Sequence, residues 1–127
     1  MLHLDHIVIT VGSIDATCDF YAGVVGLEVR TFGDGRRALQ IGRQKINLHE
    51  AGHELEPHAL RPTPGSGDFC LITDEPLEDV ISRLERLGLA IEEGPVERAG
   101  AAGQLRSIYV RDPDGNLVEI SNHASAS

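Results

Sequence analysis

Tryptophan is absent from the 127-residue sequence, and aromatic residues make up only 4% of it. The chain therefore offers few side chains on which nucleic-acid bases or sugar rings can stack. Positive charge is also scarce, because 11 Lys and Arg residues stand against 20 Asp and Glu, giving a formal net charge of -9. A chain this acidic repels phosphate backbones and anionic lipids. We therefore expect neither nucleic acid nor a membrane surface as a partner.

Long apolar runs are absent as well. No stretch reaches the roughly 20 apolar residues that cross a bilayer, and residues 1–10 lack the basic start of a secretory signal. The two cysteines, Cys18 and Cys70, stand far apart, so the sequence predicts neither a disulfide framework nor a thiolate zinc site. We expect a cytoplasmic protein with free thiols.

The periodicity of apolar residues predicts the same order of elements twice: a strand, a helix and three further strands. In the first half, strands are expected at 2–11, 27–32, 37–41 and 45–50, with a helix from Ser13 to Gly26. In the second half, strands are expected at 68–73, 89–96, 104–110 and 117–121, with a helix from Pro76 to Gly88.

Local sequence similarity indicates that the two halves are copies of one unit. Residues 25–29 resemble residues 87–91 at an offset of 62 (87 minus 25), which carries His6 onto Asp68. The final strands match at an offset of 72 (119 minus 47), so that Asn47 corresponds to Glu119. The difference of ten predicts an insertion, and we place it in the glycine- and alanine-rich residues 99–103.

The length and the hydrophobic content of 41% fit one domain over residues 1–127. We expect two repeats at about 1–52 and 66–123, joined by a linker loop at about 53–65 that is rich in Pro and Gly. The predicted fold class is α+β, with two βαβββ units forming a curled mixed sheet around a central trough.

Strand alternation places polar side chains on the face opposite each helix. On this face we expect His6 in the first strand and Asn47 with His49 in the fourth. The second half contributes Asp68 and Glu119. Imidazole and carboxylate groups are ligands of divalent metal ions, so this face predicts a metal site.

These residues resemble the vicinal oxygen chelate superfamily, which includes glyoxalase I, extradiol dioxygenases and bleomycin-resistance proteins. The resemblance rests on LDHIV at 4–8, FY at 20–21 followed by GL at 26–27, and DPDGNLVE at 112–119. Within the superfamily the chain is most similar to the group labelled virulence proteins or glyoxalase domain-containing protein 5. That similarity rests on GRQKINLHE at 42–50 and RPTPGS at 61–66.

The resemblance implies one divalent ion per site, held by the first and last strands of each unit. The corresponding residues are His6, Asn47, Asp68 and Glu119. The glyoxalase pattern usually has a carboxylate where Asn47 stands and a His where Asp68 stands. Because His49 offers a better nitrogen ligand than the neutral Asn47 oxygen, we expect Fe, Mn, Ni or Zn to be bound by His6, His49, Asp68 and Glu119.

The same face supplies candidates for the chemistry. Glu119 and His49 are the expected catalytic groups, because a carboxylate or neutral imidazole can move a proton. Four residues are expected to contact the substrate: Asn47, Cys70, Arg37 and Arg106. His53 and His58 lie in the linker loop, and we expect both to be solvated.

The sequence thus predicts a divalent-metal-dependent enzyme of lyase, isomerase or dioxygenase type, with the metal acting as a Lewis acid on a small oxygen-rich substrate. One alternative is a metal-free protein that sequesters a small ligand, as bleomycin-resistance proteins do. Another is a sensor or interaction module with a vestigial site. We expect a homodimer, because chains with only two such units usually pair.

Overall fold

The computed structural model describes residues 1–124 and contains two compact units. The first spans Met1–Gly67 together with Pro113–Gly115, and the second spans Asp68–Asp112 and the chain from Asn116 onward. The predicted linker at 53–65 is therefore grouped with the first unit.

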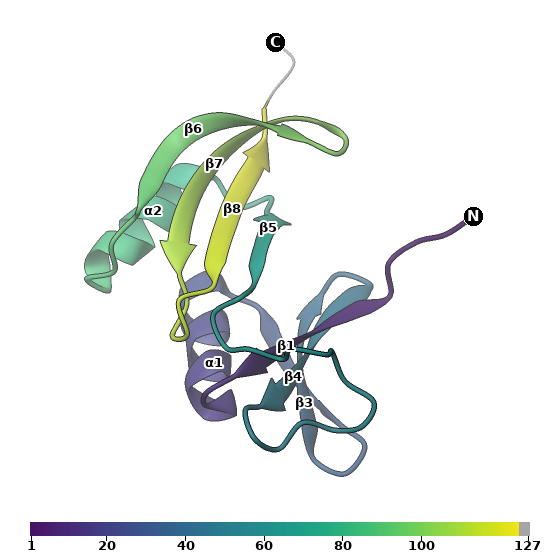
Figure 1. Ribbon diagram of the computed structural model, residues 1–127. Helices are drawn as coiled ribbons and strands as arrows, with labels where there is room; N and C mark the ends of the chain where they lie inside the picture. Colours follow the sequence, from purple (N-terminus) through teal and green to yellow (C-terminus); the bar gives the residue numbers. More distant parts are fainter. Residues whose placement is uncertain (125–127) are drawn as a thin grey trace. The chain divides into compact units, whose positions relative to one another are not determined.

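Each unit contains one open, four-stranded mixed sheet in which the first and last strands are parallel neighbours (Figure 1). The first sheet has the order β1-β4-β3-β2 and the second has the order β5-β8-β7-β6. The strands of the first unit are β1 (His6–Val11), β2 (Glu28–Phe32), β3 (Arg36–Ile41) and β4 (Gln44–Glu50). Those of the second are β5 (Asp68–Ile72), β6 (Glu93–Gly100), β7 (Gly103–Arg111) and β8 (Leu117–His123). The predicted α+β class with two βαβββ units is confirmed.

The helix of the first unit begins where the sequence predicts. Ser13 is the N-cap of α1 (Ile14–Phe20), and its hydroxyl accepts a hydrogen bond from Ala16 N at 3.1 Å. A π-helical turn, η1 (Tyr21–Val25), continues the helix to Gly26. Gly26 has φ 88°, a left-handed conformation that glycine adopts without strain.

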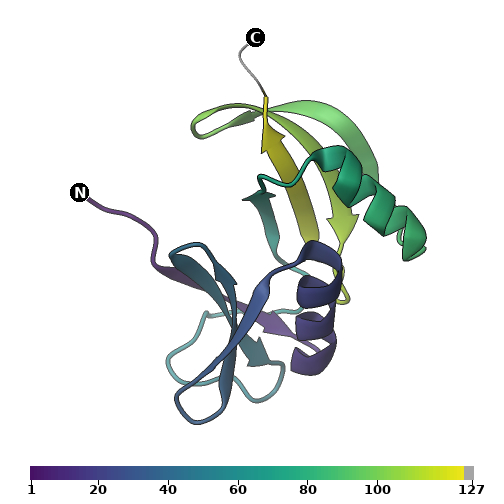
Figure 2. The ribbon, with the colours of Figure 1, turned by 180° about the vertical axis from the view of Figure 1, so that it is seen from behind.

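The helix of the second unit, α2 (Leu77–Arg86), lies across one face of its sheet (Figure 2). Asn122 on β8 fixes its start, because Asn122 Oδ1 accepts a hydrogen bond from Leu77 N at 2.8 Å. The side chains that α2 buries are Leu77, Val80 and Leu84. Across from them, the sheet buries Ile108, Val118 and Ile120.

The parallel pairs of strands repeat with the same register. Val8 lies opposite Asn47 in the first sheet, and Cys70 lies opposite Glu119 in the second. These pairs are related by the offsets of 62 and 72 that the sequence gives. The register therefore supports the duplication.

Three predicted details are wrong. Strand β1 begins at His6 rather than at residue 2, and Leu2 and Leu4 before it are exposed. Strand β6 begins at Glu93 rather than at residue 89, because Leu89 belongs to the C-terminal motif of α2, where its N–H donates to Leu84 O at 2.9 Å. Residues 99–103 are not a loose insertion, since Gly100 pairs with Gly103 at the end of a hairpin.

Candidate functional site

One face of the first sheet brings the polar residues of β1 and β4 together, and we call it the first polar face. Residues that are partners across parallel strands point to the same side of a sheet. The first polar face therefore contains His6, Val8 and Thr10 on β1, and Lys45, Asn47 and His49 on β4.

Two side chains of this face are buried with unsatisfied polar atoms. Asn47 is 4% exposed and His49 is 6% exposed. Neither Asn47 Oδ1 nor His49 Nδ1 has a hydrogen-bond partner in the described part of the chain. Most buried polar atoms in proteins have a partner, so this pair indicates a place where a ligand, an ion or water completes the structure.

His49 is poised to remain neutral. Burial lowers the pKa of His49, and the positive charge of Arg36 and the neighbouring His58 lower it further, while Glu54 acts in the opposite direction. A neutral imidazole with a free nitrogen can accept a proton or bind a metal ion. The loop that contains Glu54 and His58 thus lies near enough to influence His49.

His6 has a carboxylate that orients its ring. His6 Nδ1 lies 2.8 Å from Asp5 Oδ2. An imidazole held in this way presents Nε2 to a ligand, an arrangement common among metal-binding histidines. The side chain of His6 is 45% exposed, so part of it is open to solvent.

The register bears on which residue of β4 can act with His6. His6 lies opposite Lys45, two residues from Asn47 and four from His49. At roughly 3.3 Å per residue, Asn47 is about 7 Å and His49 about 13 Å along the strand from His6. This spacing disfavours one ion shared by His6 and His49, and it favours the family position, Asn47.

In the second unit, Glu119 is the centre of a hydrogen-bonded cluster. Ser107 Oγ donates to Glu119 Oε2 at 2.6 Å and lies 2.7 Å from Ser121 Oγ. Cys70 Sγ lies 3.3 Å from Ser121 Oγ. Within the described residues, the hydrogen bonds to this carboxylate fall on Oε2, so Oε1 is available for another partner.

Cys70 belongs to this cluster but is a poor nucleophile. Burial raises the pKa of the Cys70 thiol, and the Ser121 hydroxyl only partly offsets that effect. A thiol with a raised pKa is largely protonated at neutral pH and reacts slowly. Its structural position beside Glu119 agrees with the face expected from the sequence.

Asp68 has the same relation to Glu119 that His6 has to Asn47. Asp68 lies opposite Leu117, two residues from Glu119 along β8. Each unit therefore presents one first-strand ligand candidate and one last-strand candidate at the same spacing. Within residues 1–124, no three His, Cys, Asp or Glu side chains gather at one point.

Arg37 and Arg106 lie on the helix side of their sheets, where both form ion pairs. Arg37 Nη1 contacts Asp15 Oδ1 of α1 at 2.7 Å. Arg106 Nη1 contacts Glu78 Oε1 of α2 at 2.6 Å. These contacts join a third-strand cation to a first-turn acid in each unit, so we favour other cations as substrate contacts.

The DPDGN turn has a structural role. Asp112 accepts hydrogen bonds from the backbone and side-chain nitrogens of Asn116 at 2.9 and 2.7 Å. At the tip of the turn, Asp114 Oδ1 accepts a hydrogen bond from Gly12 N at 3.0 Å. The first five residues of the DPDGNLVE motif therefore stabilise the fold, whereas its last residue is the candidate ligand Glu119.

Comparison with known proteins agrees with this arrangement of elements. Residues 3–120 match the model of the Glyoxalase/Bleomycin resistance protein/Dioxygenase superfamily. The chain belongs to this superfamily. It is 54% identical over 120 residues to virulence protein STM3117 of Salmonella typhimurium, covering 94% of this chain and 83% of that protein. It is 50% identical over 123 residues to the glyoxalase domain-containing protein RDO1 of Mycosarcoma maydis, covering 97% and 69%.

Solved structures show the same fold. The crystal structure of virulence protein STM3117 superposes with a TM-score of 0.93 at 52% identity and covers 98% of both chains. The chain is also similar to a lactoylglutathione lyase from Agrobacterium tumefaciens, with a TM-score of 0.70 and 25% identity, covering 94% of this chain and 92% of that one. The antibiotic-binding protein TnmS3 of a Streptomyces species shares the fold at a TM-score of 0.76 and 21% identity, covering 98% of each chain.

The superfamily description itself combines glyoxalases and dioxygenases with bleomycin-resistance proteins, so membership alone leaves both catalysis and binding open. As for membrane spans, the described helices are all too short or too polar to cross a bilayer.

Proposed function

We propose that this protein is a divalent-metal-dependent enzyme of lyase, isomerase or dioxygenase type that acts on a small, oxygen-rich substrate. The observation that carries the proposal is the buried, unsatisfied pair on β4, Asn47 Oδ1 and His49 Nδ1. Two such atoms on one face of a strand are costly unless a bound species satisfies them.

Each unit supplies two proposed metal ligands at its family positions, His6 and Asn47 in the first unit and Asp68 and Glu119 in the second. They fit a divalent ion chemically, because they combine an imidazole with oxygen donors. Local contacts support their roles, since Asp5 orients His6 and Ser107 orients Glu119. A bound Fe, Mn, Ni or Zn ion would supply Lewis-acid chemistry to an oxygen of the substrate.

His49 is the proposed proton carrier. It is buried and has a lowered pKa, so it is neutral and can accept a proton at Nδ1. The distance along β4 favours this role over that of a metal ligand, although sequence reasoning prefers His49 as the ligand. Glu119 is the second candidate for moving a proton, through the oxygen that Ser107 leaves available.

A metal-free binding protein is the second candidate, and Asn47 is the observation that favours it. Asn is a weak neutral ligand, so replacing the usual carboxylate reduces the affinity of the site for metal. In that case Asn47 and His49 would hydrogen-bond a sequestered ligand directly.

Metal content separates the two candidates. We expect the protein, purified without a chelating tag, to contain one divalent ion per site by native mass spectrometry, and His6→Ala or Glu119→Ala to abolish stoichiometric metal. Asn47→Ala should lower metal affinity more than His49→Ala does, with a difference of about tenfold in calorimetric titrations. His53→Ala is the matched control, because His53 is 78% exposed. Full metal retention in both the His6 and Glu119 variants would refute the metalloenzyme proposal.

A further inference from the structure

The first polar face extends onto β3 and β2 and carries two neighbouring cations, one on β3 and one on β4. Ala38 on β3 lies opposite Asn47, so Arg36, two residues away, points to the same side. Phe32 on β2 lies opposite Arg36 and shares that side as well. Lys45, from β4, already belongs to the first polar face.

Both cations rest on one aromatic ring. Lys45 Nζ lies 3.6 Å from the centroid of the Phe32 ring, and Arg36 Cζ lies 4.8 Å from it. A cation–π contact stabilises each charge modestly and limits the conformations of a long side chain. The ring therefore holds two half-buried positive charges close together.

These two charges differ from most other cations of the chain. Six arginines form an ion pair with a carboxylate, as expected in a chain with a net charge of -9. Among the described residues, no carboxylate lies within ion-pair distance of Arg36 or Lys45. Two positive charges held against one ring repel each other, and an anion bound between or beside them would offset that repulsion. Asp5 is an acid near this pair: the charge of Lys45 helps to lower the pKa of Asp5, but the Asp5 carboxylate contacts His6 at 2.8 Å instead. In so acidic a chain, two neighbouring cations with no carboxylate paired to them are the arrangement expected of an anion site.

The cations are also close to the candidate proton carrier. Ala38 lies opposite Asn47 in the antiparallel pair of β3 and β4, so Arg36, two residues before Ala38, is level with His49, two residues after Asn47. An anionic group held by Arg36 would therefore lie next to the unsatisfied Nδ1 of His49. Guanidinium groups suit carboxylates and phosphates, because their planar donors match two oxygens at once.

We propose that Arg36 and Lys45, steadied by Phe32, form a site for a carboxylate or phosphate group, and hence that the substrate is a small organic anion. This inference rests on the proposed function, since it names the substrate class of the same face. It also replaces the roles that sequence reasoning gives to Arg37 and Arg106, both of which have carboxylate partners.

The test uses the full chain after removal of metal with a chelator, titrated separately with inorganic phosphate and with acetate at low ionic strength. We expect binding of at least one anion, with Arg36→Gln and Lys45→Gln each weakening it about tenfold or more. Phe32→Leu keeps both charges and should weaken binding about two- to fivefold. The preferred anion shows which of the two groups the substrate carries.

Arg43→Gln is the matched control, because Arg43 is an exposed cation in the turn between β3 and β4. Its affinity for the anion should stay within about twofold of the native value. No measurable binding of either anion, or equal weakening in the Arg43 variant, would overturn the proposal. Metal content is measured separately on protein that has not been treated with chelator. Stoichiometric metal without anion binding would refute the anion site and leave the metalloenzyme proposal standing. Anion binding without metal refutes only the metalloenzyme. Thermal unfolding of each variant verifies that it is folded.

Discussion

At the scale of single residues, the first polar face combines burial with missing partners. Asn47 and His49 occupy positions where apolar residues would be easier to bury. Retaining polar atoms there costs stability, because each unsatisfied buried group costs roughly 1–3 kcal/mol. We therefore expect the free protein to gain stability whenever a ligand satisfies these atoms.

The titration of His49 should be visible in the stability of the fold. Its pKa in the folded chain lies below the ordinary 6.5, so below that pH the unfolded chain binds a proton more readily than the folded chain does. The contribution of His49 is fully present above pH 6.5 and is lost as the pH falls towards the folded pKa. We expect urea unfolding at pH 7.5 and 5.0 to show a smaller pH effect in His49→Gln than in the native protein. An unchanged difference would contradict this, and exposed His53→Gln is the control.

Ser107 is a positioning residue for Glu119. Removing its hydroxyl deletes the 2.6 Å hydrogen bond and leaves only the 3.4 Å contact from Ser121. We expect Ser107→Ala to lower zinc affinity about 10- to 100-fold by calorimetric titration, as loss of an orienting partner commonly does. Ser107→Thr should restore most of it, since the hydroxyl returns. Exposed Ser82→Ala should change nothing, and equal affinities in the Ala and native proteins would show that Glu119 is oriented by other contacts.

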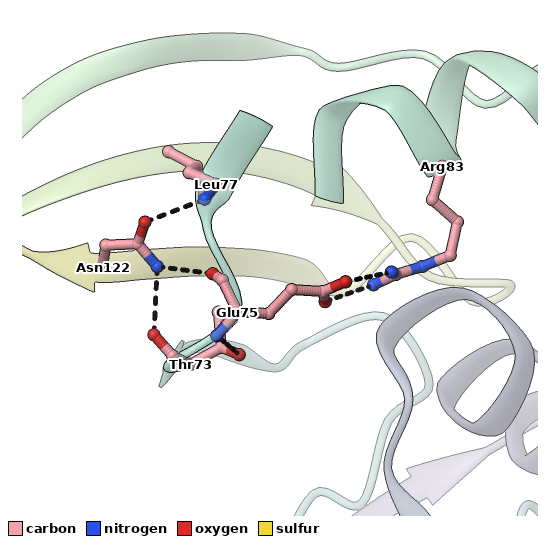
Figure 3. A network of polar contacts seen from close by, with 5 residues as sticks. All are labelled: Thr73, Glu75, Leu77, Arg83 and Asn122. Atoms are coloured by element: carbon pink, nitrogen blue, oxygen red, sulfur yellow. Dashed lines mark hydrogen bonds and ion pairs between the residues drawn. The ribbon is translucent and has the colours of Figure 1, made fainter. Parts of the chain in front are cut away.

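At the scale of elements, β8 positions both the candidate ligand Glu119 and the helix behind the sheet. Asn122, three residues after Glu119, hydrogen-bonds Leu77 N through Oδ1 and the carbonyls of Thr73 and Glu75 through Nδ2 (Figure 3). Glu75 in turn pairs with Arg83 through two contacts of 2.6 and 2.9 Å. One side chain thus ties β8 to the start of α2 and to the segment that precedes it.

Asn122→Ala should destabilise the fold by about 2–3 kcal/mol, because it removes a helix cap and leaves two carbonyls without their donor. Asn122→Asp keeps the acceptor for Leu77 N but loses the amide donor, so it should destabilise the fold less than Asn122→Ala does. Chemical denaturation measures both. The adjacent exposed His123→Ala serves as control, and equal losses in the Ala and His123 variants would contradict the role of Asn122.

The order of elements could be predicted because apolar spacing directly reflects which residues are buried. Leu77, Val80 and Leu84 recur at helical spacing and are all buried. The start of β6 could not be predicted in the same way. Leu89 alternates like a strand residue, but its hydrogen bond to Leu84 O makes it part of the helix end.

Candidate site residues were predictable only in part, for a similar reason. Alternation within a strand indicates which side chains share a face, and it finds Asn47 with His49 correctly as neighbours on one face. It contains no information on register between strands, which places His6 opposite Lys45 and far from His49. Alternation also does not show which of two adjacent arginines has an acidic partner. Arg36 contacts the Phe32 ring on one face of the sheet, whereas Arg37 pairs with Asp15 on the other.

At the scale of the whole molecule, two of the four outer strands of the sheets are unusually apolar. Strands β1 and β5 are edge strands of their sheets, and their sequences are HIVITV and DFCLI. Ile7, Val8 and Ile72 on them are 37%, 45% and 48% exposed. Natural edge strands are usually protected by charges, proline or a covering segment, since a free apolar edge pairs readily with another chain.

We therefore predict a homodimer that covers these strands. Light scattering at micromolar concentrations should give twice the 13.7 kDa mass of one chain. Ile72→Asp places a charge on an apolar edge and should shift the protein towards monomer, since burying an unpaired carboxylate is costly. Leu87→Asp is the matched control, because Leu87 is also a half-exposed apolar residue, at 51%, but lies at the end of α2 and in neither edge strand. A native protein that is monomeric at all concentrations, or a dimer weakened equally by the two variants, would show that β1 and β5 are not what a second chain covers.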